Sequence, residues 1–449
     1  MTVTQYSTNA FSRFSARALA PALPVPELIS CRPTKDPVGQ EFTGFGVALT
    51  GSSCWLLAKM PPDRRRAFLR DIFTPEGLNL SVARLTVASS DYSAELYSYD
   101  DTPEDRELRH FSVERDRAYI LPMIREVLEV RPDLFLFASP WSPPGWMKTG
   151  GSMCGGFMRD EYLDCYADYL VRYLLAYEKE GVHISALTPQ NEPLNNQYGR
   201  MPACIWHPDT EARFVPILRK KLTENGLSTG IWINDHSFNE VIPRVLWQLE
   251  TYPELAGMCA GAAFHYYAGS VEQTAVLRER YPRLALHFTE GGPRLQDNYG
   301  TDWCKWAILI IKTLETGYSS FTGWNLLLDE TGGPNIGPFP CGGLMTFDSR
   351  TGELSPSGQY HAFRHFAPFL RPGAQIYPLA FENNLSYRMF SYPKTGKKVE
   401  GCFIRNRDGE EALVLANPNE TKRQIGFFHR DTPWYIELLP DTVATVVFR

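Results

Sequence analysis

Two glutamates follow apolar stretches of the chain in matching contexts. Glu192 lies in the stretch at 184–193, which reads ISALTPQNEP, and Glu290 ends the stretch at 284–290, which two glycines follow. A carboxylate at the C-terminal end of a buried strand adds little to stability and is well placed for chemistry. Either glutamate alone could be an exposed charge at a strand end, but the matched pair favours catalysis. Two carboxylates are what cleavage of a glycosidic bond requires.

The two glutamates can take different roles in such a cleavage. A general acid needs a raised pKa, which partial burial and a neighbouring carboxylate provide. A nucleophile must stay ionised with the help of hydrogen bonds and a cation. Arg84, on an earlier predicted strand, could supply that cation or could form a structural ion pair. If the strands converge as in known barrels, the two carboxylates lie about 5–5.5 Å apart, the separation that retains configuration.

Further polar and aromatic residues follow the other apolar stretches. The carboxyl ends of parallel barrel strands meet at one face, so these residues are expected to surround the glutamates. Aromatic rings, amides, a histidine and acids are the expected content of a sugar pocket. The predicted rim residues are Thr50, Gly51, Ser90, Asp91, Trp141, Asn191, Asp235, His236, His265, Tyr266, Tyr267, Trp324 and Asn325.

The stretches that carry these residues are predicted strands, and amphipathic helices separate them. The predicted strands lie at 41–50, 81–89, 134–141, 184–193, 230–235, 261–267, 284–290 and 319–328. The predicted helices lie at 61–73, 117–130, 161–179, 209–226, 301–316 and 360–370, and a further one begins after a capping box of Ser270 and Gln273. Eight strand–helix units in a single run predict an α/β fold, the (β/α)8 TIM barrel.

Three of these helices carry residues with a predicted orientation. In the helix at 161–179, tyrosines recur at spacings of three or four, which indicates packing on the barrel rather than a binding surface. Arg65, within a run of three arginines, is predicted to face outward, and Asp209 is predicted to cap its helix. The tyrosines are Tyr162, Tyr166, Tyr169, Tyr173 and Tyr177.

Beyond Pro372 the pattern changes to short strands between turn residues. The predicted strands lie at 389–393, 412–418, 425–429, 434–440 and 442–448, which is typical of an antiparallel sandwich. Residues 1–40, rich in Ser, Thr and Pro, are predicted to complete it as an edge segment. The predicted domains are a catalytic barrel at 41–371 and an all-β sandwich made of 1–40 and 372–449.

Composition argues against several classes of protein. The 449 residues carry a net charge of −6 without a basic stripe, so no nucleic-acid partner is expected. The nine cysteines are dispersed with no C-x-x-C pair, which predicts free thiols in a reducing, cytoplasmic compartment rather than a zinc ribbon. Prolines interrupt the apolar N-terminal segment, so no signal peptide is expected. No apolar run approaches the ~20 residues of a membrane span.

Six motifs together resemble glycoside hydrolase family 30, the family of glucosylceramidase. They are GFGVALT, LTVASSDYS, SPWSPPGWMKTGG, TPQNEP, FTEGG and WNLLLDETGGPN, in that order over nearly the whole chain. The resemblance implies a (β/α)8 barrel with an attached β-sandwich and a retaining, double-displacement mechanism without metal or organic cofactor. It makes Glu192 the acid/base and Glu290 the nucleophile. By motif position, Asn191 contacts the sugar 2-hydroxyl, and the residues that line or order the sugar site are Arg84, Trp141, Tyr267, Trp324 and Asn335.

The chain departs from the family pattern at two places. Glucosylceramidase-like members carry an acidic residue after the threonine of the first motif, and it grips the distal sugar hydroxyls; here Gly51 stands in its place. A glycine removes a bidentate acceptor, so the sugar is expected to be held by another residue, such as Asp91 or His110, or to carry a substituent there. The glycine-rich segment GGSMCGG at 150–156 is expected to alter the pocket rim.

Three functions follow from these observations. The chain is predicted to be a retaining β-glycosidase for β-glucosides or related sugars, acting on a carbohydrate or glycoconjugate. An endo-acting β-1,6-glycanase of the same fold is the alternative, because the predicted grip on a terminal sugar is weakened. A non-catalytic carbohydrate-binding protein is a third reading, but binding alone does not need two glutamates together with Asn191.

Overall fold

The computed structural model describes residues 2–22, 29–384 and 397–449, and these residues form two compact units. One unit comprises Phe45–Leu295 and Ser320–Ser355, and the other comprises Met1–Gly44, Gln296–Ser319 and Pro356–Arg449. The predicted domain limits at residues 41 and 371 stay a prediction, because spatial compactness is a different criterion from independent folding.

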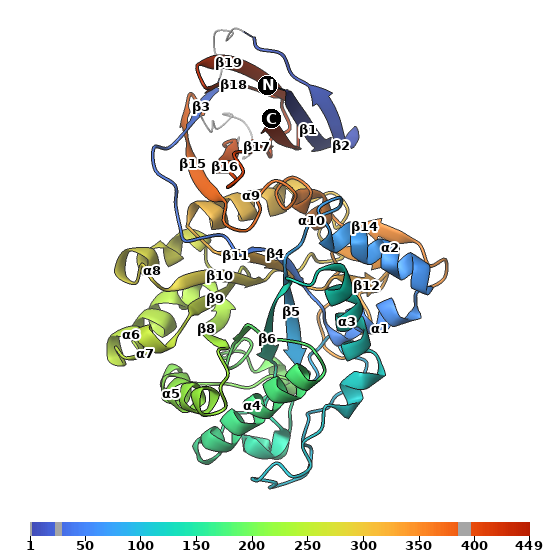
Figure 1. Cartoon of the computed structure of the whole chain (residues 1–449), viewed down its shortest axis with the longest axis vertical. Coiled ribbons are helices and arrows are strands. Elements are labelled where there is room, and N and C mark those ends of the chain that lie inside the picture. Colours follow the sequence, from blue (N-terminus) through green and yellow to red (C-terminus); the bar gives the residue numbers. More distant parts are fainter. Residues whose placement is uncertain (1, 23–28, 385–396) are drawn as a thin grey trace, which may run out of the picture. The chain divides into compact units, whose positions relative to one another are not determined.

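Eight strands close into a barrel in which each pairs in parallel with the next along the chain (Figure 1). Nearly all of their residues are buried, as expected for a parallel sheet covered on both faces. The predicted (β/α)8 barrel is confirmed. The strands are β4 (Gly44–Ala48), β5 (Val82–Val87), β6 (Phe135–Pro140), β7 (Ala186–Leu187), β8 (Gly230–Ser237), β9 (Gly261–His265), β10 (Ala285–Glu290) and β11 (Ser320–Gly323).

Strand β7 covers only Ala186 and Leu187 and is much shorter than the predicted stretch at 184–193. Pro189 has no N–H to donate to a neighbouring strand, so the ladder stops before it. Glu192 has a φ of 45°, in the left-handed region, which turns the main chain away from the strand direction. A turn beyond the strand, rather than the strand itself, therefore carries this glutamate.

Helices follow the strands, but those at Gly51–Lys59, Trp247–Thr251 and Leu255–Met258 were not predicted, and the last one ends at Phe363 rather than at residue 370. They are α1 (Gly51–Lys59), α2 (Pro62–Phe73), α3 (Ile120–Val130), α4 (Leu163–Lys179), α5 (Pro208–Glu224), α6 (Trp247–Thr251), α7 (Leu255–Met258) and α8 (Ala275–Arg280). Two further helices, α9 (Trp303–Glu315) and α10 (Gly358–Phe363), group with the β unit. The capping box of Ser270 and Gln273 is present as predicted.

Helix α4 presents its tyrosines to the barrel, as predicted. Tyr166, Tyr169, Tyr173 and Tyr177 are fully buried. The outward orientation of Arg65 was wrong: its guanidinium is mostly buried and bonds Glu126 on α3 at 2.6 Å, because α3 packs over this side of α2. The cap of α5 was also misplaced, since the side chain of His207 accepts the N–H of Asp209.

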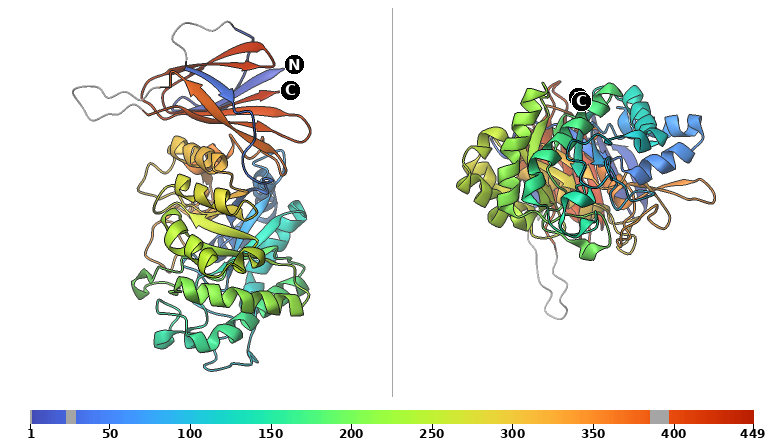
Figure 2. Two further views of the ribbon diagram at one scale, coloured as in Figure 1. Left: turned by 90° about the vertical axis from the view of Figure 1, so that its left-hand side faces the viewer. Right: turned by 90° about the horizontal axis from the view of Figure 1, so that it is seen from below.

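The second unit is built on a nine-stranded sheet in the order β19-β18-β3-β15-β16-β17-β20-β1-β2. Its strands form two layers around a shared core to which both ends of the sheet contribute (Figure 2). The predicted β-sandwich is thus confirmed. The strands are β1 (Val3–Asn9), β2 (Ser12–Ala18), β3 (Ile29–Pro33), β15 (Gln375–Glu382), β16 (Glu400–Arg405), β17 (Glu411–Asn417), β18 (Arg423–His429), β19 (Thr432–Leu438) and β20 (Thr442–Phe448).

The N-terminal segment enters this sheet more deeply than an edge. Only β2 lies at the margin, whereas β1 pairs on both sides and β3 lies between β15 and β18. Strands β15 and β16 were not predicted, and the predicted strand at 389–393 lies outside the described residues.

All nine cysteines are free thiols. Within the described ranges, no helix combines the length and the apolar character needed to cross a membrane. The predicted cytoplasmic location and the predicted lack of a nucleic-acid partner stay predictions.

Candidate active site

The two predicted catalytic glutamates meet at the carboxyl end of the barrel. A carboxylate oxygen of Glu192 lies within 4.8 Å of one of Glu290. Both side chains line a cavity of about 190 Å³. Residues distant along the chain are brought together because their strands, β7 and β10, end at the same face of one closed barrel. The separation is close to the one used by retaining glycosidases, ~5–5.5 Å.

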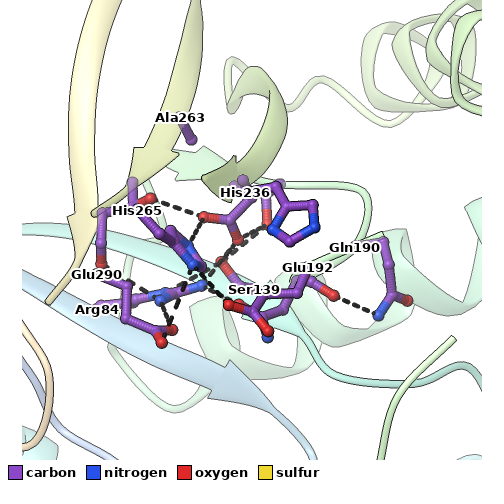
Figure 3. A network of polar contacts seen from close by, with 12 residues as sticks. Arg84, Ser139, Gln190, Glu192, His236, Ala263, His265 and Glu290 are labelled. Carbon is purple, nitrogen blue, oxygen red and sulfur yellow. Dashed lines mark hydrogen bonds and ion pairs between the residues drawn. The ribbon is translucent and has the colours of Figure 1, made fainter. Parts of the chain in front are cut away.

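Arg84 lies beneath the two glutamates and joins several strand ends (Figure 3). The side chain is fully buried on β5. Its Nη1 donates to Glu290 at 2.6 Å, and its Nη2 donates to Asn191 at 2.8 Å and to Asp235 at 2.8 Å. The guanidinium therefore both neutralises a catalytic carboxylate and orients the amide next to the other one. Arg84 is thus both the predicted cation beside a catalytic carboxylate and a member of a structural ion pair.

Asp235, like Arg84, forms contacts with several residues of the network. Sequence analysis expected it at the rim but assigned it no role. It is fully buried at the end of β8, with Oδ1 3.0 Å from Nε2 of His265 and 2.7 Å from the hydroxyl of Thr289. The hydroxyls of Ser139 and Thr188 lie 2.8 Å from Oδ2. Burial alone raises the pKa of Asp235, but Arg84 and His265 outweigh it and hold this pKa well below its usual range.

A buried ion pair supports the turn that carries Asp235. Asn234 and Asp235 have φ of 79° and 44°, at a bulge between β8 and β9. The N–H of Asn234 donates to Glu211 at 3.0 Å, and Glu211 in turn binds Arg244 at 2.6 Å. Both charged side chains are at most 1% exposed. Left-handed conformations are costly for residues other than glycine, so this pair holds the bulge that aims Asp235 at the site.

His265 stands between the two catalytic carboxylates. Its Nδ1 lies 3.2 Å from Oε1 of Glu192 and 3.9 Å from Oε1 of Glu290. Burial by itself lowers the pKa of His265, but Glu290, Asp235 and Glu192 together raise it to about 9. The ring is fully buried and lies outside the cavity lining, so it acts on the glutamates rather than on a sugar, contrary to the substrate-binding role predicted for it.

Two amides hold the carboxylate of Glu192. Asn195 donates to its Oε2 at 3.0 Å, and Gln197 donates to the same oxygen at 3.1 Å. Burial by itself raises the pKa of Glu192, but the hydrogen bond from His265, the charges of His236 and His265, and the hydrogen bond from Asn195 lower it to about 2. The raised pKa predicted for a general acid is therefore absent from the ligand-free site. The contact with His265 therefore favours the ionised carboxylate of Glu192 in the ligand-free site.

Glu290 accepts hydrogen bonds from Arg84 and from the hydroxyl of Tyr267, the latter at 2.9 Å. Burial raises the pKa of Glu290, and the charge of Glu192 adds to that rise, while His265 and Arg84 oppose it. The hydrogen bonds from Arg84 and Tyr267 favour the opposite direction, a lowered pKa of Glu290. Arg84 is a permanent cation 2.6 Å away and stabilises the carboxylate form of Glu290 at any pH at which the protein is folded.

Aromatic rings form one wall of the cavity. Trp141 and Trp324 stack with their ring centroids 5.0 Å apart, and the guanidinium of Arg84 lies 4.9 Å and 5.4 Å from the two centroids. Tyr92 packs edge-on against Trp324. Cation–π contacts of this kind hold the rings in place, so the wall is formed before a ligand arrives.

Asp91 also lines the cavity, and its side chain lacks a hydrogen bond at Oδ1. Burial and the charges of Glu290 and Glu192 raise its pKa well above the usual range. A buried polar atom without a partner costs free energy unless a ligand satisfies it. Asp91 is therefore suited to bind a sugar hydroxyl, as one of the two predicted substitutes for the missing acidic residue at position 51.

Most predicted site residues converge, and a few do not. Asp91, Trp141, Asn191, Glu192, Tyr267, Glu290 and Trp324 line the cavity, and Arg84 and His265 contact its catalytic carboxylates. Gly51 and His110 lie outside the lining. A Cβ at Gly51 would meet Ser93 Oγ at 3.2 Å.

Asn335 orders a loop rather than lining the cavity. Its side chain donates to the carbonyl of Phe339 at 2.6 Å and accepts the N–H of Gly337 at 2.6 Å. Phe339 and Cys341, further along this loop, do line the cavity. Asn335 therefore orders the loop that lines the site, which is one of the two roles predicted for it.

Several lining residues escaped sequence analysis. Asn195, Gln197 and Met201 lie in the irregular segment after Glu192, and Arg294 follows Glu290. Their closeness in sequence to the two glutamates was the available signal. No periodicity marks such loop residues, because their positions depend on how the loops fold over the barrel end.

One oxygen of Glu192, one of Glu290 and Nδ1 of His265 are close enough together to bind a metal ion. The chemistry of the site disfavours one, because Arg84 already neutralises Glu290 at 2.6 Å and a metal would add a second cation beside it. The predicted lack of metal and cofactor stays a prediction.

Comparison with known proteins defines the class to which this fold and site belong. Residues 42–370 match the glycosyl hydrolase family 30 TIM-barrel domain, so the chain belongs to this family and is a glycoside hydrolase with a carbohydrate substrate.

Among the relatives, an endo-1,6-beta-D-glucanase of Neurospora crassa is 30% identical over 84% of this chain and 79% of its own length. Putative glucosylceramidase 3 of Caenorhabditis elegans is 30% identical over 91% of this chain and 80% of its own length. Two solved structures are similar over the whole fold. SrfJ from Salmonella typhimurium has a TM-score of 0.89 at 28% identity, covering 100% of both chains. The endo-beta1,6-glucanase BT3312 has a TM-score of 0.86 at 27% identity, covering 99% of this chain and 98% of its own.

Proposed function

We propose that this retaining β-glycosidase cleaves β-linked glucosyl residues with Glu192 as acid/base and Glu290 as nucleophile. The observation that carries the proposal is the approach of the two carboxylates to within 4.8 Å across one cavity. A larger gap, ~6.5–9.5 Å, would leave room for the water molecule of an inverting enzyme.

In the first step, a carboxylate oxygen of Glu290 attacks the anomeric carbon while the bond to the leaving oxygen breaks. Glu192 donates its proton to that oxygen, which departs as a hydroxyl. In the second step, Glu192 removes a proton from water, and the resulting nucleophile releases the sugar from Glu290 with net retention. Asn191, whose amide oxygen accepts a hydrogen bond from Arg84 at 2.8 Å, is assigned the contact with the sugar 2-hydroxyl.

The hydrogen bond between His265 and Glu192 supplies the acidic proton. Transfer from Nδ1 across the 3.2 Å contact converts the resting pair into neutral His265 and protonated Glu192 without any proton uptake from solvent. Asp235, 3.0 Å from Nε2, keeps the other ring nitrogen protonated in both states. The low pKa of Glu192 in the ligand-free site therefore describes where the proton rests, and a substrate that displaces water around Glu192 favours its return to the carboxyl group.

We further propose a β-1,6-linked glucan as the substrate. Support comes from the relatives named endo-1,6-β-glucanases. A glycoconjugate is the second candidate, since other relatives are named glucosylceramidases.

The proposal is tested by following the hydrolysis of a linear β-1,6-glucan with proton NMR. The β-anomer of the new reducing end is expected first, before mutarotation. Initial release of the α-anomer would contradict the retaining mechanism. Failure to cleave the polymer, together with turnover of aryl β-glucosides, would contradict the choice of glucan and leave the catalytic roles standing.

A further inference from the structure

Two loops beside Glu192 are joined to each other. One covers residues 148–158 and the other residues 194–206, which follow Glu192 in the chain. Bridges connect them at Cys154 with Pro202 and at Phe157 with Ile205. The second loop is therefore held in place by the first, although neither contains a long regular element.

The buried side chain of Lys148 forms hydrogen bonds with both loops. The ammonium of Lys148 donates to the carbonyls of Met153 and Ala203, each at 2.7 Å, and to the hydroxyl of Ser142 at 2.8 Å. One carbonyl belongs to each loop, and the lysine is only 2% exposed. An ammonium with its three protons all engaged makes strong, charge-assisted bonds, so the loops move as one body.

Two glycines of the first loop make its close packing possible. Gly155 and Gly156 have φ of 72° and 82°. A Cβ at Gly155 would lie 2.5 Å from Oδ1 of Asn196, and a Cβ at Gly156 would lie 2.5 Å from the carbonyl of Thr149. A side chain at Gly155 would push the two loops apart, and one at Gly156 would collide with the first loop itself. The predicted effect of the segment at 150–156 on the pocket rim stays a prediction.

The tip of the second loop has a strained backbone next to the acid/base. Gln197, Tyr198 and Gly199 are consecutive left-handed residues, with φ of 50°, 52° and 67°. The first two are not glycines, and strain of this kind is retained where function requires it. Gln197 binds Glu192 at 3.1 Å, so the backbone of the adjacent Tyr198 lies near the acid/base.

The two loops expose apolar side chains between polar ones. Tyr198 is 86% exposed, Phe157 is 54% exposed and Leu194 is 40% exposed; we call these three residues the rim platform. Their polar neighbours include Asn195 and Arg200, whose guanidinium lies 5.4 Å from the Tyr198 ring centroid. Leu194 and Tyr198 belong to the same loop as the cavity-lining residues Asn195, Gln197 and Met201.

We infer that the rim platform binds the leaving-group sugar of a β-linked glycan, with Tyr198 as the stacking residue. The acid/base must lie beside the departing oxygen, so the leaving group occupies the side of the cavity from which Glu192 and this loop come. Aromatic rings stack on the apolar faces of sugars, while guanidinium and amide groups bind their hydroxyls. An alkyl chain would instead require a continuous apolar surface, which Asn195, Gln197 and Arg200 interrupt.

The inference rests on the proposed function. Two substrates distinguish a failure of the inference from a failure of the proposed function. β-Glucosyl fluoride has a single-atom leaving group that cannot reach Tyr198, whereas a β-1,6-linked glucose trisaccharide presents a sugar to the platform. For Tyr198→Ala, kcat/KM is expected to fall about five- to tenfold on the trisaccharide and to stay unchanged on the fluoride. Tyr198→Phe keeps the ring and is expected to retain most of the activity.

Phe428→Ala, which removes a 62% exposed ring from the β unit, is the matched control and is expected to change neither rate. Equal activity of Tyr198→Ala and wild type on the trisaccharide would overturn the platform, and so would an equal loss on both substrates. If Tyr198→Ala lost activity only on glucosylceramide in detergent micelles, the ligand of the rim platform would be a lipid and not a sugar. A wild-type enzyme inactive on the fluoride would overturn the proposed function and the platform with it.

Discussion

Nδ1 of His265 lies 3.2 Å from Oε1 of Glu192, and both side chains are tied into a network that also contains Asp235 and Arg84. The catalytic carboxylates are thus parts of one charged cluster rather than independent groups. The ionisation of each depends on the others, and this coupling determines what substitutions are expected to do.

Substitution of the nucleophile tests the role of Glu290. Glu290→Gln is expected to lower kcat by on the order of 10³-fold or more, because an amide cannot form the covalent intermediate. In Glu290→Gly, azide can occupy the space left by the carboxylate, attack an activated β-glucoside and form the α-glucosyl azide. Product analysis by NMR checks this outcome, and formation of the β-azide would assign the nucleophile elsewhere.

Substitution of the acid/base is expected to depend on the leaving group. Glu192→Gln is expected to lose about 10²- to 10⁴-fold in activity on glycans, whose alkoxide leaving groups need a proton. The glycosylation rate of a dinitrophenyl β-glucoside, which leaves without protonation, is expected to change far less. Pre-steady-state kinetics separate this step from the second one, and equal losses on both substrates would contradict the acid role.

The proton on His265 is expected to appear in the pH dependence of stability. The pKa of His265 is raised to about 9 in the folded protein, against ~6.5 in the unfolded chain. The folded state binds this proton more tightly, so its contribution is complete below pH ~6.5 and is lost as the pH rises through about 9. Urea unfolding is expected to show a declining free energy of unfolding across this window, and a flatter curve for His265→Gln. An unchanged slope in the variant would exclude His265 as the proton's site.

Asp91 and Gly51 offer a test of how the sugar is held. Asp91→Asn is expected to raise KM for β-glucosides, because Asp91 lines the cavity and one of its carboxyl oxygens has no hydrogen-bond partner. Gly51→Asp is expected to change glucoside activity less, since a Cβ there meets Ser93 rather than the cavity. Steady-state kinetics of both variants check this order. A large gain for Gly51→Asp would show that the missing acid, and not Asp91, limits recognition.

The ion pair of Glu211 and Arg244 is expected to matter for both stability and activity. Arg244→Met leaves a buried carboxylate unpaired, which costs about 3–5 kcal/mol. The matched control is Arg213→Gln on the same helix as Glu211, which removes an exposed pair with Asp209 and is expected to cost less than about 1 kcal/mol. Denaturant unfolding measures both. Among the molecules that stay folded, Arg244→Met is also expected to lower kcat, and an unchanged kcat would remove the pair from the positioning of Asp235.

Several parts of this enzyme were determined by the sequence alone. The alternation of apolar stretches and amphipathic helices predicted the barrel, because burial on both faces of a parallel sheet and on one face of each helix imposes distinct periodicities. Glu192 and Glu290 were found because a carboxylate after an apolar strand has no packing role. Strands β15 and β16 escaped because turn residues and charges interrupt their pattern.

Only the tertiary structure decided how the site works. The sequence offered His265 as a sugar ligand, and the fold made it a proton holder by surrounding it with Asp235, Glu192 and Glu290. Burial and the distances between charges set a pKa, and both come from strands far apart in the chain. The same holds for the loops around Tyr198, whose conformation depends on glycines and a lysine of another segment. Local sequence specifies which groups are available, whereas the closed barrel determines which of them meet.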